Sequence, residues 1–74
     1  MITMNNVERR AYANKIAKFS TEKLKQMRNA LIEEAELIKG MIYNRQSSNV
    51  EEDWETIREL ETKAYIIEIE LLFR

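Results

Sequence analysis

The sequence predicts an all-α fold in which two long helices form an antiparallel hairpin and a shorter helix precedes them. The 74 residues contain no proline and one glycine, so the residue types that most turns require are nearly absent. Good helix formers fill the chain instead. Apolar residues recur at steps of three and four, the spacing that places side chains on one face of a helix. We therefore expect a single small domain over residues 1–74, with residues 1–5 flexible, built as a three-helix bundle or a dimer of hairpins.

The first helix is predicted over residues 6–19. Asn5, followed three residues later by Glu8, forms a capping-box pattern, although Asn6 could also serve as the cap. The apolar stripe of this helix consists of Tyr12, Ile16 and Phe19. These side chains either close the core of the chain or bind a partner.

The second helix is predicted over residues 20–44, with the hydroxyl of Ser20 available to cap its first amides. Its apolar stripe follows helical spacing and comprises Leu24, Met27, Leu31, Ala35, Ile38 and Ile42. Gly40 could end the helix. Because the apolar spacing continues beyond this glycine, the sequence favours an end near Asn44.

The third helix is predicted over residues 49–73, after a polar loop at residues 46–49. Ser48 and Asn49 are each followed three residues later by a glutamate, so either could form a capping box. Its apolar stripe comprises Val50, Trp54, Ile57, Leu60, Ala64, Ile67 and Leu71. A short loop between two long helices makes them antiparallel neighbours.

An antiparallel hairpin would bring the basic start of the second helix close to the acidic end of the third. From the rise of a helix we expect three pairs across the hairpin, namely Lys25 with Glu68, Lys23 with Glu70, and Glu36 with Arg58.

The last turns of the third helix carry apolar residues on nearly every side. Residues 67–71 alternate like a strand, but no other segment could pair with them, so a helix is expected. Part of this surface needs a cover, supplied by the first helix, a partner or a second copy. The candidate partner-binding residues are Tyr65, Ile66, Ile69, Leu72 and Phe73, together with Tyr12, Ile16 and Phe19.

Composition argues against catalysis. Histidine and cysteine are absent, which removes the commonest general base and the best thiolate nucleophile and metal ligands. There is no glycine-rich phosphate loop. We therefore expect no catalytic residue, no cofactor and no metal site. No apolar run is long enough to span a bilayer and the first residues do not resemble a signal peptide, so a cytoplasmic protein without membrane contact is expected.

The charges are unevenly distributed, with basic residues concentrated in the first part of the chain and carboxylates in the rest. Four basic residues lack an obvious acidic partner and are candidate nucleic-acid contacts: Arg9, Arg10, Lys15 and Lys18. They are spread around the predicted helix, and the sequence pI is about 5.5. Nucleic-acid binding is therefore the alternative interpretation.

Residues 24–35 and 57–61 resemble the small sporulation phosphatase hairpins, whose second helix carries a Ser-Gln-Glu-Leu-Asp signature. Glu59 and Leu60 match this signature, whereas isoleucine, arginine and glutamate replace its serine, glutamine and aspartate. The hairpin co-chaperones of secretion-needle subunits have a similar architecture. The resemblance implies a third hypothesis, a regulator acting on a phosphorylated response regulator, and no functional residue is carried over.

The leading hypothesis is a non-enzymatic protein–protein interaction module that serves as a regulator, an inhibitor or a small chaperone. Its mechanism would be the burial of an apolar helix face against another protein or, in a homodimer, against itself. The length and charge pattern are typical of small accessory proteins of bacteria and phages.

Overall fold

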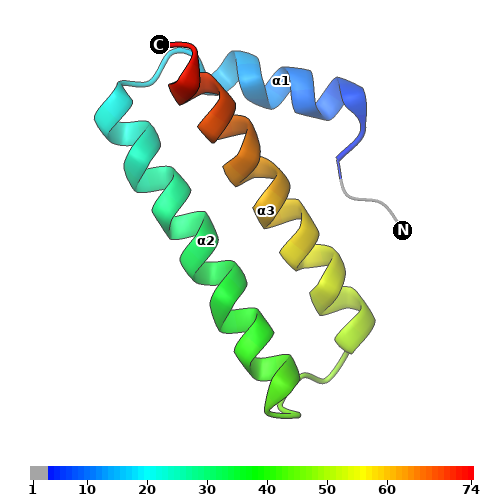
Figure 1. The fold of residues 1–74 in the computed structure, drawn as a ribbon. Helices are drawn as coiled ribbons and strands as arrows, with labels where there is room; N and C mark the ends of the chain where they lie inside the picture. Colours follow the sequence, from blue (N-terminus) through cyan, green and yellow to red (C-terminus); the bar gives the residue numbers. More distant parts are fainter. Residues whose placement is uncertain (1–3) are drawn as a thin grey trace.

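The computed structural model describes residues 4–74, which form three helices: α1 (Asn6–Ile16), α2 (Thr21–Tyr43) and α3 (Val50–Leu72). Helices α2 and α3 form a long antiparallel hairpin, and α1 crosses its open end on the side of α3 (Figure 1). The predicted all-α hairpin with an additional N-terminal helix is confirmed. Residues 1–5 were expected to be flexible. Of these, residues 1–3 lie outside the described residues.

Helix α1 begins with the predicted capping box. The side chain of Asn5 accepts a hydrogen bond from the Glu8 amide at 2.8 Å, and the Glu8 carboxylate accepts one from the Asn5 amide at 3.0 Å. The helix ends at Ile16, however, and the prediction that it continues to residue 19 is wrong. The chain turns after Ile16, and the Phe19 amide donates to the Ile16 carbonyl at 3.0 Å. This turn redirects the backbone into α2.

Helix α2 is capped by Ser20, whose hydroxyl accepts from the Lys23 amide at 3.1 Å. It passes through Gly40 and ends at Tyr43, as the apolar spacing predicted. The end is made by Arg45, which adopts a left-handed backbone conformation with φ 59°. Glycine or asparagine usually occupies such a position, so α2 ends with some backbone strain.

Helix α3 is capped by Asn49, which decides between the two predicted capping residues. The Asn49 side chain accepts from the Glu52 amide at 3.0 Å. In the preceding loop, the Ser47 hydroxyl donates a hydrogen bond to the carboxylate of Asp53 in the first turn. The acidic residues of this turn also suit the positive end of the helix dipole.

The core lies where the three helices meet. Ile16 from α1, Leu24 from α2 and Ile67 from α3 are completely buried against one another. Partly buried apolar side chains surround them: Tyr12, Phe19, Met27, Leu31, Ile66 and Leu71. Farther along the hairpin, Ala35 and Ala64 are buried between α2 and α3.

The three charge pairs expected across the hairpin are wrong. Arg28 pairs with Glu68 at 3.0 Å, and Lys39 pairs with Glu61 at 2.8 Å. Arg28 follows the buried Leu24 by one helical turn, and Lys39 follows a buried alanine by one turn. Both therefore border the seam between the helices, whereas Lys25 is exposed. Height along the hairpin therefore limits the possible partners, and the rotation of each residue about its helix axis selects among them.

Glu70 and Glu36, the remaining carboxylates of the expected pairs, interact within their own helices or with the end of the chain. Glu70 accepts from Arg74 at 3.1 Å, and Glu36 lies 3.6 Å from Lys39. Such local pairs contribute little to stability on an exposed surface.

Candidate protein-binding surface

The structure divides the eight predicted partner-binding residues into two groups. Ile16 is completely buried, and Tyr12, Phe19 and Ile66 pack around the core. Ile16 is therefore a core residue, and its prediction as a contact residue is wrong. The reason is that α1 folds back onto α3 and encloses this side chain within the same molecule.

The other four predicted residues remain on the surface at the end of α3. Tyr65 is 66 % exposed, Ile69 37 %, Leu72 78 % and Phe73 87 %. We call these four residues the apolar tip. Isolated exposed apolar residues are common, but four of them on consecutive turns of one helix form a continuous surface that water solvates poorly.

Three residues of the apolar tip belong to a second stripe along α3. Arg58, Thr62, Tyr65, Ile69 and Leu72 follow one another at alternating steps of four and three. This is the spacing of a helix–helix seam. The seam with α2 uses a different stripe of α3, which includes the buried Ile57, Ala64 and Ile67. Besides the faces that pack on α2 and on α1, helix α3 therefore presents this further stripe, whose last three residues are apolar and exposed.

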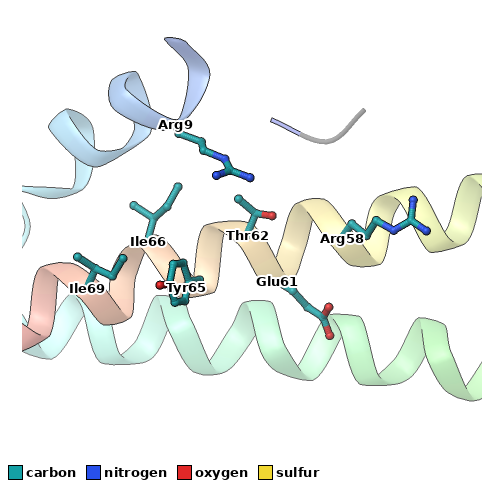
Figure 2. Close-up of a pocket in the computed structure, with 7 residues that line it drawn as sticks. All are labelled: Arg9, Arg58, Glu61, Thr62, Tyr65, Ile66 and Ile69. Atoms are coloured by element: carbon teal, nitrogen blue, oxygen red, sulfur yellow. The ribbon is translucent and has the colours of Figure 1, made fainter. Parts of the chain in front are cut away.

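A groove lies beside this second stripe, between α1 and α3 (Figure 2). Its larger hollow has a volume of about 530 Å³ and is lined by Arg9, Arg58, Glu61, Thr62, Tyr65, Ile66 and Ile69. A neighbouring hollow of about 330 Å³ shares three of these residues and adds Arg10, Ala13 and Glu70. We call the two hollows together the α1–α3 groove. Its floor is apolar and its rim is charged.

The charges on this rim are not balanced. Glu61 is paired with Lys39 of α2, and Glu70 is paired with Arg74. Within residues 4–74, by contrast, the guanidinium groups of Arg9, Arg10 and Arg58 make no ion pair or hydrogen bond. The carboxylates are neutralised and the arginines are not, so the groove has an excess of positive charge.

Lys39 shows how firmly Glu61 is held by its partner. The hydrogen bond from Lys39 to Glu61 raises the pKa of the lysine above its ordinary value of 10.5, although desolvation acts in the opposite direction. The ammonium and carboxylate groups therefore stabilise each other, and Glu61 contributes little free negative charge to the groove.

The four residues predicted to contact nucleic acid are all exposed but do not form one patch. Arg9 and Arg10 line the α1–α3 groove. Lys15 lines a separate hollow of about 370 Å³ on the other side of α1, and Lys18 lies in the turn after the helix. A phosphate backbone could not contact all four along one continuous face.

The hollow beside Lys15 is also lined by Glu59, one of the two residues that match the phosphatase signature. Glu59 pairs with Lys63 at 3.3 Å, and the Lys63 ammonium lies 5.7 Å from the centre of the Tyr12 ring. Burial raises the pKa of Tyr12 above its ordinary value of 10.0. The Lys63–Tyr12 contact joins α3 to α1, and the pair with Lys63 gives Glu59 a partner within α3.

Arg74 has a structural role for which the sequence analysis found no signal. Its guanidinium group donates to the carbonyl oxygens of Ala17 and Phe19 and to the Thr21 hydroxyl, at 3.3, 2.7 and 3.2 Å. These partners are far from Arg74 in sequence. Arg58 was also missed as a groove residue, although its place in the second stripe was visible in the spacing.

A membrane-spanning helix, a metal site or a match to a known protein would each indicate a function. Among residues 4–74, no helix combines the length and apolar character that a membrane crossing requires. The same part of the chain contains no group of three or more acidic, histidine or cysteine side chains placed to hold a metal ion. No family model matches the chain, and no curated protein and no solved structure matches it.

Proposed function

We propose that this chain is a small protein-binding module without catalytic activity, which acts as a regulator, an inhibitor or a small chaperone. It would bind by burying the second stripe of α3, together with Phe73 of the apolar tip, against a helix of another protein. Docking of an amphipathic helix into a groove is a common mode of protein recognition. A second copy of this chain is the alternative partner.

The single observation that carries this proposal is the exposure of the apolar tip beside a closed core. Ile16, Leu24 and Ile67 are completely buried against one another, yet Leu72 and Phe73 remain largely exposed. These side chains therefore do not serve the fold of the single chain. Their burial against a partner would remove about 25 cal/mol of unfavourable hydration for each Å² covered.

Nucleic-acid binding is less well supported because the predicted basic residues lie on different sides of α1. A titration with duplex and single-stranded DNA at increasing salt tests this alternative, since phosphate contacts make the affinity strongly salt-dependent. The phosphatase-like alternative is tested by Glu59→Ala, which should abolish any effect of the protein on phosphotransfer if that glutamate acts on the response regulator.

The main test uses two matched variants in affinity capture from the source cell. Tyr65→Glu places a charge in the apolar tip, and Leu37→Glu places one at an equally exposed apolar position on α2, since these residues are 66 % and 67 % exposed. Circular dichroism should show both variants folded. We expect Tyr65→Glu to lose the captured protein and Leu37→Glu to retain it, with sedimentation showing a monomer.

Equal capture by both variants and the wild type would contradict the proposal. A sedimentation mass of two chains that returns to one in Tyr65→Glu would show instead that the stripe binds a second copy.

A further inference from the structure

We infer that the α1–α3 groove selects a partner segment of particular chemistry, an acidic amphipathic helix. This inference rests on the proposed function and deepens it by naming the partner class. It is carried by the juxtaposition of an apolar floor with three arginines. Figure 2 shows the floor residues Tyr65, Ile66 and Ile69, and Arg9 and Arg58 beside them. Together with Arg10, these arginines have no ion pair or hydrogen bond to any residue of the described part of the chain.

The length of the groove suits a short helix. The stripe from Arg58 to Ile69 covers eleven residue-to-residue steps of α3, which corresponds to about 16 Å or three helical turns. A helix laid along it with apolar residues at steps of three and four would place them over Thr62, Tyr65 and Ile69. The hollow of about 530 Å³ gives room for such side chains.

The charges at the rim of the groove determine which charges the partner helix should carry beside its apolar face. Arg9 projects from α1 toward the α3 side of the groove, and Arg58 lies farther toward the start of α3 (Figure 2). Arg9 therefore reaches toward the region that the helix would occupy, and Arg58 lies at one end of that region (Figure 2). Carboxylates flanking the apolar face of the partner would pair with these arginines, and Glu61 would repel them little because Lys39 already neutralises it.

The same charges disfavour the two other occupants. A two-fold dimer formed through the groove would place the arginines of both copies in one interface, where Glu61 and Glu70 are already paired with other residues. Nucleic acid would satisfy the arginines but would place its phosphates over Ile66 and Ile69, and only Tyr65 offers an aromatic ring for base stacking. An acidic amphipathic helix would cover the apolar floor with its apolar face and pair its carboxylates with the arginines of the rim.

The test uses two synthetic peptides of about 14 residues, each with leucines at alternating steps of three and four. One carries glutamate at the remaining positions and the other carries lysine. Fluorescence anisotropy measures the binding of each labelled peptide to the intact chain. We expect the glutamate peptide to bind and to weaken as salt rises from about 0.05 M to about 0.5 M, and the lysine peptide not to bind.

Neutralising variants locate the interaction. Arg9→Gln, Arg10→Gln and Arg58→Gln should each weaken binding of the glutamate peptide about threefold, as expected for partly exposed ion pairs. Lys25→Gln, on the exposed face of α2, is the control and should change binding less than about twofold. In NMR spectra of the labelled chain, the peptide should shift the signals of Tyr65 and Ile69 and leave those of Leu37 unchanged.

Four outcomes would overturn the inference. Equal binding of both peptides would show that the arginines select nothing. Displacement of the glutamate peptide by single-stranded DNA would assign the groove to nucleic acid. A two-chain mass that the arginine variants reduce to one would assign it to a second copy. If Tyr65→Glu abolished capture of the cellular partner while the arginine variants changed neither capture nor peptide binding, the inference would fail and the proposed function would stand.

Discussion

The guanidinium group of Arg74 donates a 2.7 Å hydrogen bond to the carbonyl oxygen of Phe19, joining the segment after α3 to the turn between α1 and α2. The same group binds the Ala17 carbonyl and the Glu70 carboxylate. Carbonyl oxygens at the end of a helix lack intrahelical partners, and here an arginine distant in sequence supplies one. Arg74 therefore fixes the position of α1 across the open end of the hairpin.

Replacing Arg74 with alanine should loosen α1 while leaving the hairpin intact. Loss of these charge-assisted hydrogen bonds is expected to lower the free energy of unfolding by about 1–2 kcal/mol. Hydrogen exchange should become faster at the amides of α1 than at those around Ala35. Arg10→Ala is the control, because that side chain has no partner among the described residues, and its effect should stay within about 0.5 kcal/mol. Equal effects of the two substitutions would show that Arg74 does not hold α1.

Substitutions at two apolar positions of α3 should separate the core from the exposed surface. Ile67 is completely buried, so Ile67→Val leaves a small cavity and should cost about 1 kcal/mol. Leu72 is 78 % exposed, and Leu72→Ala should change the free energy of unfolding by less than about 0.5 kcal/mol. Urea unfolding measures both. A larger cost for Leu72→Ala would mean that this side chain serves the fold and does not belong to a binding surface.

Gly40→Ala should stabilise the chain. Gly40 lies inside α2 without a positive φ, and a Cβ atom added there would meet nothing within 4 Å. Alanine favours the helix by about 1 kcal/mol and restricts the unfolded chain, so the midpoint of thermal unfolding should rise. The reverse change at an exposed helical position, Ala30→Gly, should lower it by a similar amount. No rise for Gly40→Ala would indicate that the backbone there is not regular helix in solution.

The cap of α3 gives a test of which polar residue begins this helix. Asn49→Ala removes the side chain that accepts from the Glu52 amide and should cost about 1 kcal/mol. Ser48→Ala, at the other residue with a capping-box spacing, should have a much smaller effect. Chemical denaturation of the two variants decides the matter, and a larger loss for Ser48→Ala would place the cap one residue earlier.

Alkaline pH should destabilise the fold. The pKa of Tyr12 is raised by burial and that of Lys39 is raised chiefly by its hydrogen bond to Glu61, from ordinary values of 10.0 and 10.5. Each group loses its proton at lower pH in the unfolded chain than in the folded one. The stability they contribute is therefore fully present below about pH 10 and is lost as pH rises through the folded values.

The thermal midpoint should accordingly fall as pH rises above about 10, and Tyr12→Phe should reduce the fall because it keeps the ring and removes the ionisable hydroxyl. An unchanged pH profile in Tyr12→Phe would show that the burial of this hydroxyl does not contribute.

The sequence by itself determined the three helices and most of their ends. Apolar residues at steps of three and four identified α2 and α3 because a 3.6-residue period places such positions on one face. The side chains of Asn5 and Ser20 identified two helix starts, since they satisfy free amides through contacts only three residues long. These features are local, and local geometry can be read from the order of the residues.

Only the tertiary structure decided which surfaces meet. The pairing of Arg28 with Glu68, the early end of α1 and the capture of the Phe19 carbonyl by Arg74 depend on the rotation of each helix and on contacts between distant residues. It likewise decided that Ile16 closes the core while Leu72 and Phe73 remain outside. Apolar spacing tells which residues avoid water, but the limited room between packed helices determines which of them are enclosed.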